Sequence, residues 1–206
     1  EMLNFAEKNL IDPAQKRLFI YIDPTDKVLK SLLEEKGFKA FPERTETESA
    51  FYLTGKSLPA IADVPDGFMV GSMAEHDDLN KRCKAFGLAF DHPDPSEWPS
   101  VISYEYLQTA PDYRKDQDIV VIAPNGEFAS FCLIWYDETN HMASLEPVGT
   151  QPAYQRMGLA RAAIYEAIRR VSARGAERVI VGSSAQFYQD IGFEPNETLI
   201  RFEKHF

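Results

Sequence analysis

Hydrophobic residues change their spacing several times along the chain, and each change predicts a new element. Apolar residues at helical spacing predict helices over residues 2–10, 28–36, 77–90, 101–108 and 157–174. Short apolar runs between turn residues predict strands over residues 18–22, 68–72, 119–123, 128–136, 144–150 and 179–181. Strands and helices mixed in this way predict an α/β protein.

The middle of the chain predicts an antiparallel meander. Asn125-Gly126 is a hairpin turn between residues 119–123 and 128–136, because both residues tolerate positive φ. A second turn at 137–141 leads into the strand at 144–150. The helix at 157–174 then leads to the strand at 179–181, which predicts a parallel crossover.

The two ends of the chain share one order of elements. Residues 1–53 predict helix, strand, helix and then two strands, 38–41 and 50–53, joined by a charged loop at 43–48. Residues 157–206 predict the same order, ending in a strand that opens at Phe193 and another at 198–202. A Gly-Phe pair follows the helix in both. Residues 1–53 therefore read as a partial repeat, although helix-Gly-Phe-strand is also a common junction.

Composition narrows the class of partner. The formal charge of −10 and the pI of about 4.9 argue against nucleic acid or an anionic membrane as the main partner. The two cysteines form no CxxC pair, so neither a zinc site nor a disulfide framework is predicted. With no long apolar run and no signal peptide, the sequence predicts a cytoplasmic protein. The first residue is Glu1, so we expect the sequence to be a fragment of something longer.

A glycine loop at residues 155–160 opens the predicted helix at 157–174. The start of a helix presents free backbone N–H groups at the positive end of the helix dipole, where a phosphate or pyrophosphate binds well. Gly158 has no Cβ and lets a ligand approach, and Arg156 and Arg161 add positive charge. The alternative is an ordinary helix start with a spacing glycine.

Two motifs resemble those of the GCN5-related N-acetyltransferases (GNAT). Gln-x-x-Gly-x-Ala at residues 155–160 is similar to the family's pyrophosphate loop, and Tyr-x-x-x-Gly-Phe at 188–193 is similar to its closing motif. The resemblance implies a mixed, mostly antiparallel central sheet flanked by helices, with the fourth and fifth strands splayed apart. Pro147 in the fourth strand agrees with a splay, because proline cannot donate to a ladder; an edge position is the alternative.

The resemblance divides the chain into three parts. It implies a complete GNAT domain at residues 67–206, preceded by a partial copy at 1–53, as in a tandem GNAT protein. Residues 54–66 contain Gly55, Pro59 and Pro65 and predict a linker. One departure is that residues 182–186 are short and lack the asparagine that the family often carries near the next helix start.

The resemblance also implies a set of site residues. Acetyl-CoA would be the co-substrate, with no metal, and its contacts would come from Val148, Gly149, Thr150, Gln155, Arg156, Met157, Gly158, Leu159, Ala160 and Arg161. Glu146 is the predicted base and should face the same way as Ser144, Val148 and Thr150 by strand alternation. Tyr188 is the predicted acid, near the cofactor sulfur. A surface glutamate and a core tyrosine are the alternatives.

The predicted function is acetyl transfer from acetyl-CoA to the amine of a small molecule or peptide, by direct attack in a ternary complex. A catalytically silent acyl-CoA-binding or regulatory domain is one alternative, and a transferase for another acyl group is a second. A homodimer, and packing of residues 1–53 against another chain, both stay open.

Overall fold

The computed structural model describes residues 2–55, 58–60 and 63–206. They form two compact units: the chain up to Ala50 together with Gly182–Phe206 is unit 1, and Phe51–Val181 is unit 2. This division differs from the predicted boundaries at residues 53 and 67, because the last strand groups with the N-terminal segment. Residues 56–57 and 61–62 of the predicted linker lie outside the described residues.

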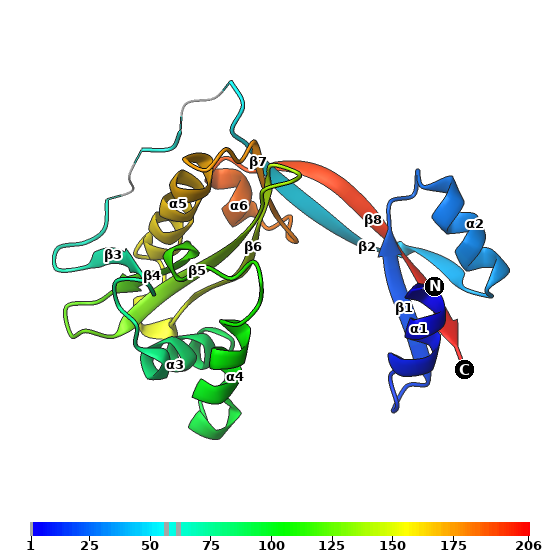
Figure 1. Ribbon diagram of the computed structural model, residues 1–206, viewed down its shortest axis with the longest axis horizontal. Helices are drawn as coiled ribbons and strands as arrows, with labels where there is room; N and C mark the ends of the chain where they lie inside the picture. Colours follow the sequence, from blue (N-terminus) through cyan, green and yellow to red (C-terminus); the bar gives the residue numbers. More distant parts are fainter. Residues whose placement is uncertain (1, 56–57, 61–62) are drawn as a thin grey trace. The chain divides into compact units, whose positions relative to one another are not determined.

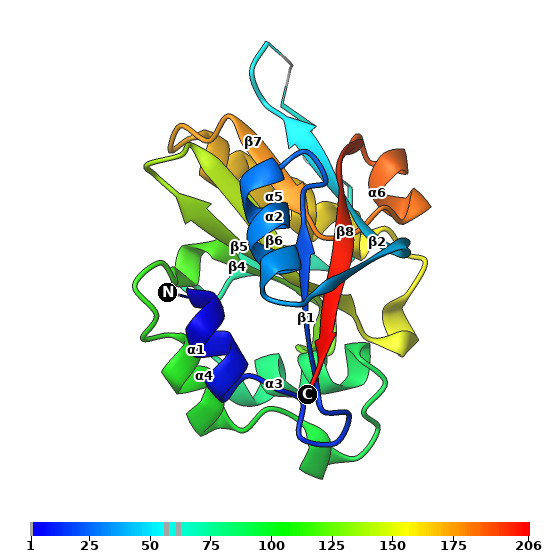
Figure 2. The ribbon, with the colours of Figure 1, turned by 90° about the vertical axis from the view of Figure 1, so that its right-hand side faces the viewer.

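Unit 1 is a three-stranded antiparallel sheet with helices. Strand β8 pairs with β1 from Arg17↔His205 onward and with β2 on its other edge (Figure 2). Its core consists of Ile22, Leu33, Phe38 and Phe202. The elements are α1 (Met2–Asn9), β1 (Arg17–Ile22), α2 (Lys27–Glu35), β2 (Lys39–Tyr52, up to Ala50 in this unit), α6 (Gln186–Asp190) and β8 (Glu194–His205).

Local sequence signals set the ends of α2. The side chain of Asp26 accepts a hydrogen bond from the Leu29 N–H at 2.9 Å, which caps the helix start. Gly37 follows the helix with a φ of 83°, a left-handed conformation that favours glycine. Both ends of α2 therefore follow from residues that lie directly beside the helix.

The long strands β2 and β8 correct two predictions. Residues 43–48 form no loop but lie within β2, and the predicted strands at Phe193 and 198–202 are one strand, β8. The two strands pair from Lys39↔Glu203 to Ala50↔Glu194, with a register shift between Phe41 and Thr45. The run of charged residues suggested a loop, but its backbone pairs with the distant strand β8. This pairing is possible because the charged side chains stay largely exposed on the strand.

Unit 2 contains the predicted meander and crossover. Its strands follow the order β7-β6-β5-β4-β3, and all pairs are antiparallel except β6 with β7. Both predictions are therefore confirmed. The elements are β3 (Met69–Ser72), α3 (Leu79–Ala89), α4 (Val101–Leu107), β4 (Asp118–Ile122), β5 (Phe128–Asp137), β6 (Met142–Thr150), α5 (Leu159–Ser172) and β7 (Arg178–Val181).

Helices cover both faces of the unit 2 strands. Helix α5 lies on one side, and α3 with α4 lies on the other (Figure 1). On the α3 side, Met73, Val120 and Phe131 are buried together with Ala85 of α3. On the other side, α5 buries an apolar stripe that includes Leu159, a residue of the glycine loop. The mixed α/β fold with a mostly antiparallel arrangement agrees with the predicted fold class.

Among the helices in the described part of the chain, none combines the length and the apolar character that crossing a bilayer requires.

Candidate functional site

A strand gap opens along β6. This strand pairs with β7 at Met142↔Arg178, Ala143↔Val179 and Ser144↔Ile180, and within the described residues the pairing ends there. On its other edge β6 continues to pair with β5 as far as Thr150↔Ser130. Residues 145–150 of β6 therefore have one edge without a β7 partner, which confirms the predicted splay around Pro147.

A bulge in β6 stands at the start of this gap. Leu145 is opposite Ile134 and Val148 is opposite Cys132, so Glu146 and Pro147 together face a single residue of β5. The Glu146–Pro147 peptide bond is cis. The Trp135 Nε1–H donates to the Glu146 carbonyl oxygen at 2.8 Å and holds the bulge against β5.

The bulge corrects the predicted direction of Glu146. Ser144 pairs with Trp135 and Val148 pairs with Cys132, and these two β5 residues are three positions apart. Ser144 and Val148 therefore lie on opposite faces of the sheet, because one extra residue resets the alternation. The prediction that Glu146 shares one face with Ser144, Val148 and Thr150 is wrong. Its side chain is exposed, and among the described residues its carboxylate has no ion-pair partner.

The glycine loop follows directly after β6. Gln151 anchors it: this buried side chain donates from Nε2 to the Phe128 carbonyl at 2.8 Å, and its N–H donates to the Ala129 carbonyl at 2.9 Å. A 3-10 turn at Pro152–Tyr154 then leads to Arg156, which has a φ of 63°. Gln151 was not predicted as a site residue; a polar residue between an apolar strand and a proline was the available signal.

Gly158 occupies the N-cap of α5 with a φ of 78°, and no side chain caps the helix. Within the described residues, the N–H groups of residues 156–161 donate to no acceptor, and the first helical bond runs from the Ala162 N–H to the Gly158 carbonyl. The loop thus presents unpaired amides beside the exposed side chains of Arg156 and Arg161. This arrangement suits an anion such as a pyrophosphate.

The other residues predicted to bind the cofactor differ in how far their side chains are exposed to solvent. Gln155 and Met157 are exposed, and the Gln155 side chain lies 3.5 Å from the Thr150 carbonyl. Leu159 is 1% exposed and packs in the core, so only its backbone is available, and Ala160 is half-buried. Thr150 shares a hydrogen bond with Ser130 at 2.8 Å.

Gly149 has a packing role. A Cβ on this residue would lie 2.5 Å from Cζ of Phe131 and 2.8 Å from Cβ of Ala89 in α3. Its α-carbon therefore faces the core beneath α3 and points away from the strand gap.

Tyr188 belongs to unit 1, whereas Glu146 belongs to unit 2. Tyr188 is half-buried on α6, and its ring makes edge-on contacts with Phe187 at 5.2 Å and Phe193 at 5.6 Å. Its backbone carbonyl accepts a hydrogen bond from the Phe193 N–H at 2.9 Å, which closes the turn before β8.

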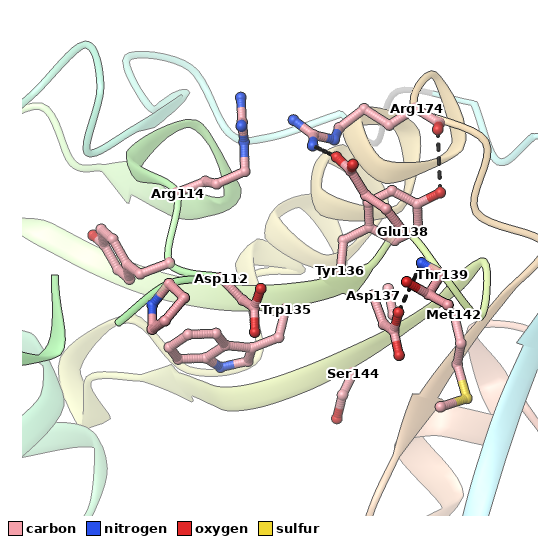
Figure 3. A pocket seen from close by; sticks show the side chains of 13 residues that line it. Asp112, Arg114, Trp135, Tyr136, Asp137, Glu138, Thr139, Met142, Ser144 and Arg174 are labelled. Atoms are coloured by element: carbon pink, nitrogen blue, oxygen red, sulfur yellow. Dashed lines mark hydrogen bonds and ion pairs between the residues drawn. The ribbon is translucent and has the colours of Figure 1, made fainter. Parts of the chain in front are cut away.

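A side pocket of about 630 Å³ lies at the end of β5 (Figure 3). Strand β4 begins opposite Leu133, so Trp135–Asp137 of β5 extend past it. The pocket lies between this extension, the loop at 111–114, the turn at 137–139, residues 142–144 of β6 and Arg174. This pocket could not be predicted from the sequence, because it depends on where β4 begins relative to β5.

Tyr113 and Trp135 form an aromatic wall of the side pocket, and buried hydrogen bonds hold Tyr113 in place. Tyr113 and Trp135 meet edge to face with ring centroids 6.1 Å apart. The Tyr113 hydroxyl donates to Asp118 at 3.0 Å, and Asp118 also accepts from Arg82 Nε at 3.0 Å, with Arg82 and Asp118 both fully buried. Burial raises the pKa of the Tyr113 hydroxyl, so it remains a protonated donor.

The charges around the side pocket leave one carboxylate free. Arg174 pairs with Glu138, and Arg114 pairs with Asp116 at 3.2 Å. Asp137 accepts hydrogen bonds from the Asn140 side chain and from the N–H groups of Asn140 and Thr139, which lower its pKa and keep it ionised. Asp112 lines the pocket and, among the described residues, has no hydrogen-bond or ion-pair partner.

In the described part of the chain, no group of three or more His, Cys, Asp or Glu side chains is arranged so that it could hold a metal ion.

Comparison with known proteins identifies the relatives of this chain. The model of the Acetyltransferase (GNAT) family matches residues 58–193, which include the strand gap, the glycine loop and the side pocket. A search of curated protein sequences found no significant match.

Several solved structures share the fold. A GCN5-related N-acetyltransferase from Sphaerobacter thermophilus superposes with a TM-score of 0.69 at 16% identity, over 94% of this chain and 61% of that one. A tandem GNAT protein from the clavulanic acid biosynthesis pathway gives a TM-score of 0.67 at 11% identity, over 92% and 64%. A GCN5-related N-acetyltransferase from Kribbella flavida gives 0.57 at 16% identity, over 91% and 67%. This chain thus spans less than two thirds of the first two proteins.

Proposed function

The chain belongs to the GNAT acetyltransferase family, as the match over residues 58–193 shows, and from that premise we propose that it is an acetyl-CoA-dependent N-acetyltransferase. The acceptor is the amine of a small molecule or peptide, which attacks the thioester directly in a ternary complex. The nitrogen lone pair forms a bond to the acetyl carbon, and the carbon–sulfur bond breaks. Counted from the ammonium form of the acceptor, the nitrogen loses two protons, one before the attack and one as the amide forms; the departing thiolate takes up one proton, and the other goes to solvent.

The glycine loop is the observation that carries this proposal. Its unpaired N–H groups at residues 156–161, with Arg156 and Arg161, would bind the pyrophosphate of acetyl-CoA. The open edge of β6 at Val148 and Thr150 would pair with the pantetheine arm as an added strand does. The loop and the open edge are consecutive in the chain, as one extended ligand requires.

Two residues would move the protons. An alkyl ammonium has a pKa near 10.4, so at neutral pH its nitrogen must lose a proton before it attacks. We propose Glu146 as the base, directly or through a water, because its carboxylate is exposed at the bulge where the strand gap begins. Tyr188 is the proposed acid for the thiolate. The Val148 N–H would hold the carbonyl oxygen of the thioester.

The organisation of the chain supports a tandem origin, which is also part of the proposal. The order α1-β1-α2-β2 repeats as α5-β7-α6-β8, and both orders end in a single long strand. We propose that residues 1–53 derive from a second, partial copy, joined through residues 54–66 to the GNAT domain at 67–206. The partial copy lacks a glycine loop of its own.

Calorimetry with acetyl-CoA and an assay for thiol release against an amine panel test the function. Gly158→Ala should weaken acetyl-CoA binding by about tenfold, because a side chain is strained at positive φ and the backbone that presents the unpaired amides would shift. Gly55→Ala is the matched control, since Gly55 has a φ of 72° and open space around its α-carbon. Glu146→Gln and Tyr188→Phe should bind acetyl-CoA normally and lose turnover.

The outcomes separate the alternatives. Binding of acetyl-CoA without turnover on any amine would favour a silent CoA-binding domain. Faster thiol release from another acyl-CoA would change the acyl group of the proposal. A folded protein with no affinity for CoA would refute it.

A further inference from the structure

We propose that the side pocket binds acceptor amines carrying a second cationic group, and that Asp112 anchors this second group. The proposal rests on the proposed function and names the substrate class for it. A linear diamine is the simplest such acceptor: one nitrogen sits in the pocket as an ammonium, and the other reaches the bulge at Glu146.

Trp135 links the side pocket to the bulge. Its ring lines the pocket, and its Nε1–H donates to the Glu146 carbonyl at 2.8 Å. Ser144, two residues before Glu146, also lines the pocket. A molecule in contact with Trp135 is therefore one side chain away from the residue proposed as the base. The pocket and the proposed base are neighbours within unit 2.

The charges determine what this pocket prefers. Arg114, Arg174 and Glu138 have ion-pair partners, and Asp137 is occupied by the turn that it caps. Asp112 is the remaining carboxylate, without a partner among the described residues (Figure 3). It can form a charge-assisted hydrogen bond with an ammonium group.

An ammonium held by Asp112 lies in the side pocket and not at the open edge of β6, where the thioester would lie. The nitrogen at Asp112 is therefore the one that is not acetylated, and it stays protonated because the carboxylate favours the charged form. The substrate must accordingly carry two nitrogens, one that anchors it and one that reacts.

The aromatic wall suits the same ligand. An ammonium is attracted to the faces of aromatic rings, tryptophan most strongly. The Tyr113 ring is held in place by its hydrogen bond to the buried Asp118, so the wall needs little rearrangement on binding. The volume of about 630 Å³ falls within the common range for small-molecule sites.

Ligand binding in the side pocket can be followed by the fluorescence of Trp135. The chain has two tryptophans, so Trp98→Phe leaves Trp135 as the single reporter in the wall of the pocket. We would titrate this variant with cadaverine and with pentylamine, a monoamine of the same carbon length, with and without CoA. Cadaverine should change the Trp135 fluorescence at a concentration about five- to tenfold lower than pentylamine does, and added salt should reduce the difference.

Asp112→Asn should raise the Kd of cadaverine about five- to tenfold and change that of pentylamine less than twofold. Glu105→Gln is the control, because it removes one negative charge from an exposed site on α4 outside the pocket. It should leave both titrations unchanged. In the transferase assay, Asp112→Asn should raise KM for cadaverine while kcat changes less than twofold. If Trp98→Phe does not fold, calorimetry on the wild-type and Asp112→Asn proteins gives the same comparison.

Failure of this inference differs from failure of the proposed function. Equal affinity for cadaverine and pentylamine, or no effect of Asp112→Asn, would overturn the inference even if the protein acetylates amines. Asp112-dependent binding of cadaverine without any acetyl transfer would uphold the inference and overturn the transferase.

Discussion

Replacing Gly149 with alanine tests whether this residue serves packing or cofactor binding. Gly149 lies in the open part of β6, among the residues predicted to contact acetyl-CoA, yet its α-carbon faces α3. The added Cβ would lie 2.5 Å from Phe131 Cζ and 2.8 Å from Ala89 Cβ, well inside ordinary contact distance. The substitution should therefore destabilise unit 2 and leave the strand gap unchanged.

The surroundings decide the magnitude. Phe131 is fully buried, and the guanidinium of Arg82 lies 3.9 Å from its ring centroid, so the ring has little room to turn away. Overpacking a tight core costs about 1–3 kcal/mol. Replacing glycine by alanine returns about 0.4–1 kcal/mol through the entropy of the unfolded chain. Because the Phe131 ring is confined, the overpacking cost should lie in the upper part of its range, about 2–3 kcal/mol, and the net loss in the free energy of unfolding should be about 1–2 kcal/mol.

Urea unfolding followed by tryptophan fluorescence measures this loss, because Trp98 and Trp135 both belong to unit 2. With an m-value of about 2 kcal/mol/M, the midpoint should fall by about 0.5–1 M. Adding Phe131→Leu removes the clashing atom, so the double variant should be more stable than the two single effects predict, by about 1 kcal/mol. Gly182→Ala is the control, because a Cβ there meets no atom within 4 Å.

Acetyl-CoA affinity of Gly149→Ala should change less than about threefold, since the new methyl group points away from the strand gap. A stable Gly149→Ala protein with a large loss of CoA affinity would refute the packing argument. A urea midpoint within 0.2 M of the wild-type value would show that α3 moves to accommodate the methyl group, and it would contradict the predicted loss of about 1–2 kcal/mol.

Two further predictions concern buried and surface charge. Asp118→Asn leaves the fully buried Arg82 without its counter-charge and should cost about 3–5 kcal/mol in urea unfolding. Tyr113→Phe removes only the neutral hydroxyl, which donates to Asp118 and accepts from Gln108, and should cost about 1–2 kcal/mol; equal costs would contradict this. In unit 1, hydrogen bonds from Lys204 and Lys36 lower the pKa of Glu7 below its ordinary value of 4.5. The contribution of Glu7 to stability is present above pH 4.5 and is lost as the pH falls through the lowered pKa. Glu7→Gln should therefore reduce the loss of stability at acid pH, measured by circular dichroism. An unchanged loss of stability at acid pH would contradict a role for these ion pairs.

Local patterns in the sequence located most elements because each signal lies within a few residues of what it specifies. Helical spacing located α3 and α5, and Asn125-Gly126 marked the hairpin before β5. The glycine loop was identified in the same way, since Gly158 acts on the backbone that immediately surrounds it. These signals also pointed to the family.

The misjudged features depend on segments distant in sequence. Residues 43–48 looked like a loop until their pairing with β8 made them a strand. The face of Glu146 was mispredicted because a bulge is set by the register between β5 and β6.

The sequence by itself determined the order of most elements in unit 2, the loop that opens α5 and the family. Only the tertiary structure decided that Gly149 faces Phe131 and that a bulge at Glu146 shifts the alternation of side chains along β6. It also decided that β5 extends past the start of β4 and forms one wall of the side pocket. The physical reason is that register, bulges and strand ends depend on hydrogen bonds and packing between distant segments, and the local spacing of apolar residues carries no record of them.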